Sequence, residues 1–176
     1  MKKICSTLII ISGILLLAAC TSNPVPNQEL AEKVDIEEFM GTWYIHGYTP
    51  TAIDKEAWNG TETYERLPDG KIQTTYAFQK GSPEGKRKTY HPVGTIVNTD
   101  TNAEWRMRFF GIINAAYYVL YVDPDHTFTV IGHPNRKYAW IMSRDSKINE
   151  QRYSELRGEL EEREYELSNF VRMQHK

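Results

Sequence analysis

Short runs of alternating apolar and polar residues, separated by turn-forming residues, fill the middle of this chain. Alternation with a period of two is typical of half-buried strands, and segments such as Pro68-Asp69-Gly70 form tight turns. Sequential antiparallel strands of this number predict an all-β fold, either an up-and-down barrel or a sandwich. An eight-stranded closed barrel has no free edges and leaves room for one small ligand. The eight predicted strands are Thr42–Tyr48, Thr61–Leu67, Lys71–Gln79, Lys88–Val97, Ala103–Phe109, Tyr117–Val122, Thr127–Ile131 and Tyr138–Ser143.

Two helical segments flank the strands. Asp35 followed by Glu38 has the pattern of a capping box and predicts one helical turn before Gly41. After Ser146, apolar residues recur at heptad-like spacing, which predicts a helix at about 149–165 with Asn149 as its N-cap. The apolar stripe predicts that this helix packs on the barrel wall, and a short extended segment is expected at 169–173. The stripe consists of Tyr153, Leu156, Leu160 and Leu167.

The N-terminus predicts export and lipid attachment. Lys2 and Lys3 precede an apolar stretch from Leu8 to Leu17, which is shorter than the roughly 20 residues of a membrane span. Leu17-Ala18-Ala19-Cys20 resembles the lipobox, whose cysteine is acylated in bacterial lipoproteins. We therefore expect a signal peptide at 1–19, a lipidated N-terminus and tether at 20–34, and the barrel with its helix at 35–176.

Composition and motif searches favour a binding protein. The formal net charge is −2, and no long basic stripe points to nucleic acid. Cys5 lies in the predicted signal peptide, so Cys20 has no partner for an internal disulfide. The five histidines show no metal-ligand spacing, and neither a nucleophile elbow nor a phosphate loop is present. We expect no metal, no cofactor and no catalysis.

A pair of residues at the two ends of the strand region carries the family resemblance. Gly41-Thr42-Trp43-Tyr44 opens the first strand, and Arg144 follows the last. In a closed barrel these strands are neighbours, so the guanidinium can lie over the indole, a contact that contributes roughly 1–2 kcal/mol. This arrangement resembles the lipocalin signature, and Asp123 partly matches its middle motif, although Pro124-Asp125 departs from it.

Further segments are similar to the bacterial outer-membrane lipocalins of Blc type. They are Phe109-Phe110-Gly111, Trp140-Ile141-Met142-Ser143-Arg144 and the lipobox. The resemblance implies an eight-stranded up-and-down antiparallel barrel with one C-terminal helix. It also implies that Gly41, Trp43, Asp123 and Arg144 are fold-signature residues.

The alternation also predicts which side chains face a ligand. If Trp43 points inward, Ile45 and Gly47 point inward too. If Arg144 points inward, so do Met142, Trp140 and Tyr138. The sixth strand is apolar on both faces; by analogy with relatives, Tyr117 and Val119 point inward. Tyr118 and Leu120 then face outward, under the helix or at a homodimer contact. The predicted ligand-binding residues are Ile45, Trp105, Met107, Tyr117, Val119, Tyr138, Trp140 and Met142.

The resemblance implies a membrane-anchored lipocalin that binds, stores or transports a hydrophobic ligand such as a fatty acid or lysophospholipid. Thr21 after Cys20 favours the outer membrane, with the protein facing the periplasm. Lys55 and Arg108 are candidates for contacting an anionic head group. One alternative is an interaction lipoprotein with a self-filled barrel and a partner-binding or dimer-binding outer face. Another is an enzyme, which would need a polar pair inside the barrel that the inward-facing residues above do not supply.

Overall fold

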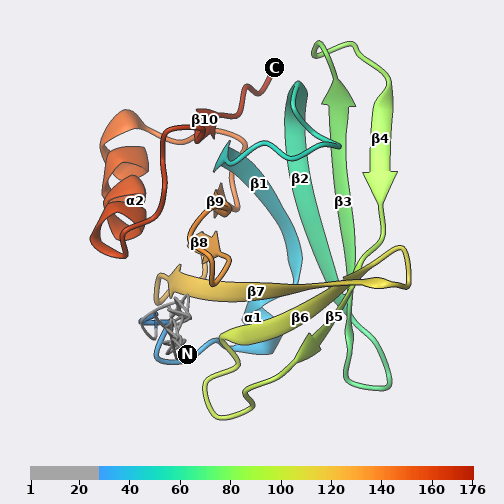
Figure 1. The fold of residues 1–176 in the computed structure, drawn as a ribbon, viewed down its shortest axis with the longest axis vertical. Helices are drawn as coiled ribbons and strands as arrows, with labels where there is room; N and C mark the ends of the chain where they lie inside the picture. Colours follow the sequence, from blue (N-terminus) through green and yellow to red (C-terminus); the bar gives the residue numbers. More distant parts are fainter. Residues whose placement is uncertain (1–27) are drawn as a thin grey trace, which may run out of the picture.

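The computed structural model describes residues 28–176, which form a closed antiparallel β-barrel with one C-terminal helix on its wall (Figure 1). From β1 to β9, strands that follow each other in the chain pair in antiparallel fashion, except that β4 and β5 both pair with β3; pairing of β1 with β9 closes the barrel. The predicted fold class is thereby confirmed. The strands are β1 (Gly41–Tyr48), β2 (Ala57–Arg66), β3 (Ile72–Lys80), β4 (Arg87–Tyr90), β5 (Val93–Ile96), β6 (Glu104–Phe109), β7 (Ile113–Val122), β8 (Phe128–Gly132), β9 (Ala139–Ser143) and β10 (Val171–Arg172).

One predicted strand is interrupted. The run Lys88–Val97 forms two strands, β4 and β5, on either side of His91-Pro92. Proline has no backbone N–H and therefore cannot donate to a sheet ladder. β4 pairs only with β3, whereas β5 pairs with both β3 and β6. Counted together, β4 and β5 occupy one of the eight positions around the barrel.

A bulge in β1 corrects one predicted orientation. Ile45 pairs with Met142 and Gly47 pairs with Ile141, so the register shifts at the residue between them, His46. The shift reverses the alternation, which places Tyr48 in the barrel core and Gly47 on the outside. A Cβ atom on Gly47 would lie 2.7 Å from the Phe170 ring. The inward orientation predicted for Gly47 is therefore wrong.

Both predicted helices are present. The Asp35 carboxylate accepts the backbone N–H groups of Glu37 and Glu38 and caps α1 (Ile36–Phe39). The second helix, α2 (Glu150–Glu162), begins after Asn149, whose side chain accepts the N–H of Arg152 at 2.8 Å. Within residues 28–176, no helix is long and apolar enough to cross a membrane.

The helix α2 packs on the outer face of β8 and β9. Leu156 and Leu160 are fully buried there, in a cluster that also contains Leu120, Val130 and Ile141. Of the two outward residues predicted on β7, Leu120 is buried in this outer cluster, and Tyr118 packs against it. The helix therefore covers this part of the predicted outer stripe.

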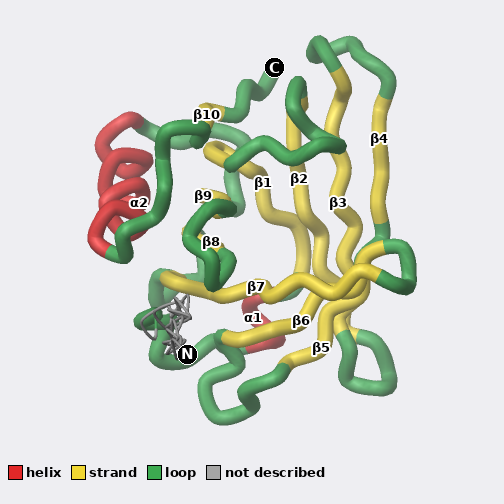
Figure 2. The backbone as a smooth tube through the Cα atoms, viewed as in Figure 1, coloured by secondary structure: helices red, strands yellow, loops and turns green. Residues whose placement is uncertain are grey.

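The two ends of the described chain also lie on the barrel (Figure 2). Residues 28–34, which the sequence assigns to the tether, run along its wall: the N–H of Ala31 donates to the carbonyl of Val119 at 3.0 Å, and Val34 is fully buried. At the other end, β10 pairs with β1 at Gly47 and Tyr48, which confirms the expected extended segment. The backbone hydrogen bonds fix both segments to the barrel.

Candidate ligand-binding site

The fold-signature residues close one end of the barrel. The Arg144 guanidinium lies 3.8 Å from the centroid of the Trp43 ring, as the sequence predicts. It also donates to the backbone carbonyls of Thr42, Glu38 and His126. Gly41, with φ of +90°, adopts a backbone conformation that favours glycine. This end of the barrel is thus a closed base.

Asp123 has a different structural role. Its Oδ1 accepts the backbone N–H groups of Thr127 and Phe128, both at 2.7 Å, and its Oδ2 accepts the Thr127 hydroxyl at 2.6 Å. These bonds hold the turn between β7 and β8. Asp123 lies outside the cavity described below.

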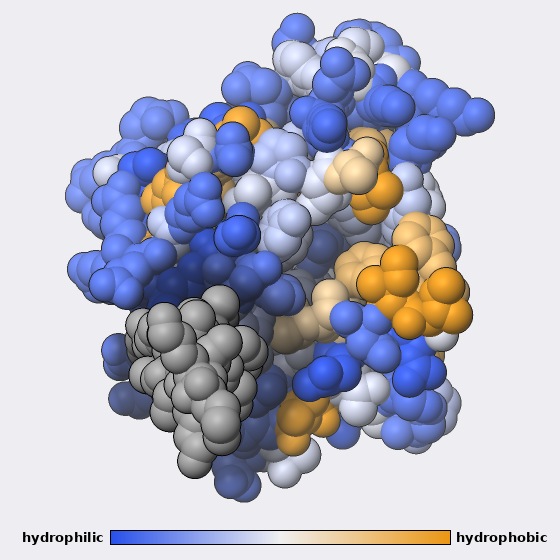
Figure 3. Space-filling model, in the orientation of Figure 1, coloured by the Kyte–Doolittle hydropathy of each residue, from blue (hydrophilic) through white to orange (hydrophobic). Residues whose placement is uncertain are grey.

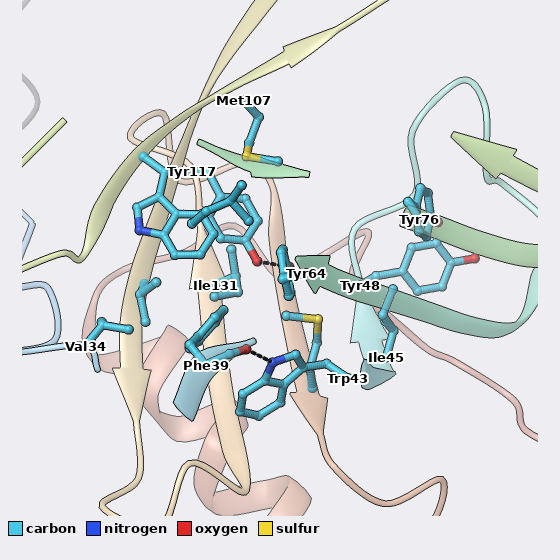
Figure 4. Close-up of a cluster of buried hydrophobic side chains, with 14 of the residues drawn as sticks. Val34, Phe39, Trp43, Ile45, Tyr48, Tyr64, Tyr76, Met107, Tyr117 and Ile131 are labelled. Atoms are coloured by element: carbon cyan, nitrogen blue, oxygen red, sulfur yellow. Dashed lines mark hydrogen bonds between the residues drawn. The ribbon is translucent and has the colours of Figure 1, made fainter. Parts of the chain in front are cut away.

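Above the base, side chains of the barrel itself fill the interior. Phe39 packs against Trp43 and Tyr64, with ring centroids 5.0 and 5.4 Å away (Figure 4). The ring of Trp105 is also 5.4 Å from that of Phe39. This packing leaves no room for a ligand at that depth. Four of the predicted ligand-binding residues are fully buried in this core and do not line the cavity: Ile45, Trp105, Val119 and Met142.

A cavity of about 240 Å³ lies above this core. It extends to the surface at Tyr138, which is 37% exposed. Four of the predicted ligand-binding residues line it, namely Met107, Tyr117, Tyr138 and Trp140. The other lining residues are Thr51, Ile53, Asp54, Glu62, Tyr76, Phe109, Ala115, Ala116 and His133.

The cavity wall includes a polar cluster that the sequence did not predict. Oε2 of Glu62 lies within hydrogen-bond distance of the hydroxyls of Tyr64 and, at 3.4 Å, Tyr117, and the two hydroxyls are also within hydrogen-bond distance of each other (Figure 4). Each hydroxyl has one hydrogen, so the three contacts are all hydrogen bonds at once only when the Glu62 carboxyl is protonated. Nearby, the Tyr76 hydroxyl donates to Asp54 at 2.8 Å. The expectation that no polar pair lies inside the barrel is therefore wrong. Glu62 and Tyr64 are two residues apart on β2 and therefore lie on the same face of the strand. An assignment of inward and outward faces to β2 would have predicted that Glu62 points inward with Tyr64.

Burial controls the electrostatics of this cluster. The pKa of Glu62 is raised to about 7: removal from water raises it most, the hydrogen bonds from the two tyrosine hydroxyls oppose the shift, and the negative charge of Asp54 adds to it. The pKa values of Tyr64 and Tyr117 are raised well above the usual value, mainly by burial. Both tyrosines are therefore neutral near pH 7 and available as hydrogen-bond donors.

The cavity lining carries no lysine or arginine. Lys55 and Arg108, the candidates for contacting a head group, are both exposed and lie outside the lining. Arg108 points away from the cavity and donates to Asn114 on the neighbouring strand at 3.4 Å. Within residues 28–176, no group of three or more His, Cys, Asp or Glu side chains is arranged to hold a metal ion.

Two further features lie outside the cavity lining. His46 does not line it; its Nε2 is 2.8 Å from the Ser143 hydroxyl, and burial lowers the pKa of His46 to about 4. The turn between β6 and β7 exposes apolar side chains, among them Ile112 at 82% exposure, and forms the apolar patch at the right of Figure 3. Phe109, immediately before this turn, lines the cavity.

Comparison with known proteins identifies the family. A family model described as a lipocalin-like domain matches residues 34–175, almost all of the described chain. The chain belongs to the lipocalin family. Lipocalins are generally binding or transport proteins, and this lipocalin has the closed base and internal cavity that such a role requires.

Relatives of this lipocalin come from different kingdoms. It is 29% identical to temperature-induced lipocalin-1 of Arabidopsis thaliana, over 80% of this chain and 78% of the relative. It is 24% identical to outer membrane lipoprotein Blc of Escherichia coli strain K12, over 90% of each chain. Among solved structures, insecticyanin from the tobacco hornworm Manduca sexta superposes with a TM-score of 0.65, at 16% identity over 86% of each chain. That likeness supports the fold.

Proposed function

We propose that this protein is a lipid-anchored lipocalin that binds, stores or transports a single-chain hydrophobic ligand, such as a fatty acid or lysophospholipid, in the bacterial envelope. The observation that carries the proposal is the cavity at the open end of the barrel. Met107, Tyr117 and Trp140 give it largely apolar walls. Tyr138 and Phe109 complete the apolar side nearest the opening.

The size of the cavity restricts the ligand. About 240 Å³ is below the roughly 300–1,000 Å³ of typical drug-sized sites, which favours one acyl chain over two. Each buried methylene contributes about 0.8 kcal/mol, so a chain of moderate length offsets an association cost of about 4–15 kcal/mol. The walls impose little geometric selection on such a chain, and broad tolerance of chain type follows.

The proposed anchor is Cys20, which lies outside the described residues. Its support is the lipobox-like Leu17-Ala18-Ala19-Cys20 segment and similarity to a protein named outer membrane lipoprotein. We propose attachment to the outer membrane on its periplasmic side. Labelled palmitate incorporation and membrane fractionation test this: Cys20→Ser should abolish the label and release the protein from the membrane fraction.

The ligand-binding part is tested by titrating the purified, delipidated protein with lysophospholipids and long-chain fatty acids while tryptophan fluorescence is recorded. Trp140 lines the cavity, so occupancy should give a saturable change at micromolar ligand. Ala115→Phe is the matched blocking variant, because Ala115 pairs with Met107 across β6 and β7 and lines the cavity. It should weaken binding at least about tenfold, or about 1.4 kcal/mol.

The control is Asn114→Phe, one residue earlier on β7, outside the cavity lining and exposed. It should bind like the wild type. If no acyl ligand changes the fluorescence of the delipidated protein, the cavity is not a lipid site, and the partner-binding alternative with a self-filled barrel becomes the better account.

A further inference from the structure

The polar cluster in the cavity contains one acid with both carboxylate oxygens hydrogen-bonded and one acid with a single oxygen hydrogen-bonded. Both oxygens of Asp54 have partners: Oδ1 accepts the N–H and hydroxyl of Thr51 at 2.6 and 2.8 Å, and Oδ2 accepts the Tyr76 hydroxyl. This carboxylate fixes the loop before β2. These hydrogen bonds explain why Asp54 is buried here, and no ligand is needed to explain it.

Glu62 differs because its hydrogen bonds fall on one oxygen. Both tyrosine hydroxyls reach Oε2, whereas Oε1 accepts no hydrogen bond from residues 28–176. The side chain lines the cavity. Oε1 is not among the buried side-chain atoms that lack a partner, so it keeps accessible surface and can be reached from the cavity. A ligand that displaces water from the cavity must supply a donor to this oxygen, because a carboxyl oxygen desolvated without one costs free energy.

The charges around the cavity set the chemistry of that donor. The titratable groups around Glu62 and the cavity are Asp54 before β2, Tyr64 on β2, Tyr76 on β3, Tyr117 on β7, and His133 and Tyr138 between β8 and β9. None of the lining residues is lysine or arginine. A ligand carboxylate or phosphate inserted here would therefore meet two carboxyl groups and no fixed cation, which is costly in a desolvated site.

We propose that Oε1 of Glu62 accepts a hydrogen bond from the inserted end of the ligand, so that the cavity selects single-chain amphiphiles ending in a hydroxyl or ammonium group over those ending in a carboxylate. The proposal rests on the proposed function, since it assumes that the cavity takes an acyl or alkyl chain. It makes a free fatty acid the weaker ligand. It also gives Tyr64 and Tyr117 the task of holding Glu62 through Oε2, leaving Oε1 toward the ligand.

The test compares three ligands with the same chain: decylamine, decanol and decanoate. Dissociation constants are measured by tryptophan fluorescence on the delipidated protein at about pH 8, where the amine is cationic and the fatty acid ionised. The amine and the alcohol should each bind at least about tenfold more tightly than decanoate. Glu62→Gln should remove the advantage of the amine over the alcohol. Glu65→Gln, on the same strand and exposed, should leave the ranking unchanged.

A pH series separates Glu62 from its neighbours. Between about pH 6 and about pH 8 the fraction of ionised Glu62 rises, so affinity for decylamine should rise while affinity for decanol changes little. Glu62→Gln should lose this trend, and Glu65→Gln, which is exposed and outside the cavity lining, should retain it. The wild-type ranking needs no variant, so the test holds even if a substitution impairs folding.

Equal affinity for decanoate and decylamine, in wild type and Glu62→Gln alike, would overturn the proposal and leave the proposed function intact. That result would mean that ligands insert their methyl end and keep the head group in solvent. Binding of none of the three compounds, nor of any lysophospholipid, would overturn both proposals.

Discussion

The two ends of this barrel are built on opposite principles. At the closed end, Phe39, Trp43 and Trp105 are fully buried, and the only polar groups among them, the two indole N–H groups, donate to the carbonyls of Phe39 and Asn102. At the open end, Glu62, Asp54 and Tyr76 surround empty volume. The same closed sheet thus holds a filled core and a hollow one.

The difference follows from what each end can pack. Flat aromatic rings at centroid distances near 5 Å fill space to the density of a protein interior. Carboxyl and hydroxyl groups must instead meet partners at hydrogen-bond geometry, which leaves gaps between them. We infer that the stability of the barrel comes mainly from the closed end, and that selectivity for a ligand comes from the open end.

The strongest test of this division is truncation at the closed end. Trp43→Ala should lower the free energy of unfolding by about 4 kcal/mol, because it removes a fully buried indole and leaves a cavity. Trp140→Ala, at the half-buried cavity wall, should cost less, about 1–2 kcal/mol. Urea unfolding of both variants measures the difference. Equal costs would contradict the assignment of stability to the closed end.

A pH-dependent effect should distinguish the open end. The folded pKa of Glu62, about 7, lies above its unfolded value of about 4.3. The folded state therefore holds its proton more tightly, and the stability contributed by this group is lost as pH rises from about 4 through about 7. Glu62→Gln should gain up to about 3 kcal/mol relative to wild type between about pH 5 and pH 8.

The measurement is urea unfolding of both proteins at the two pH values, so that all other titrating groups cancel in the difference. Glu65→Gln, exposed on the same strand, should show no such change. A pH-independent difference between Glu62→Gln and wild type would mean that Glu62 titrates as it does in water.

A smaller effect concerns the contact that covers the closed end. Arg144→Lys keeps the positive charge but loses the planar group that lies over Trp43 and donates to three carbonyls. We expect it to lower the free energy of unfolding by about 2 kcal/mol and to leave ligand affinity within about twofold, less than 0.5 kcal/mol. A large loss of affinity with unchanged stability would place Arg144 in the binding machinery.

Local sequence patterns were sufficient for most of the fold. Each predicted strand is present within a few residues, both helix caps are formed by the predicted side chains, and β6 alternates as expected between buried Trp105 and Met107 and exposed Arg106 and Arg108. The exceptions are backbone irregularities. The break at Pro92 follows from the missing backbone N–H and could have been predicted from the sequence. The bulge at His46 depends on the register with β9, which the pattern of a single strand does not record.

The candidate site was less predictable. Alternation tells which face of a strand a residue occupies but not how far along the barrel axis it lies, so it selected Ile45 and Val119 together with Met107 and Trp140. Only the last two of these line the cavity. A charged residue within a strand is read as outward-facing because an isolated charge is rarely buried, and Glu62 departs from that expectation because two tyrosine hydroxyls hydrogen-bond to it.

By itself the sequence determined the strand count, the helix that packs on the barrel, and the residues of the closed base, since these depend on periodicity and on short motifs at fixed positions. Tertiary structure alone decided the depth of the cavity, the side chains that line it, and the meeting of Glu62 with Tyr117 from a strand 55 residues away. The physical reason is that the burial of Glu62, and the pKa shift that burial causes, depend on the combined effect of side chains from several strands. These side chains come together only once the barrel has closed.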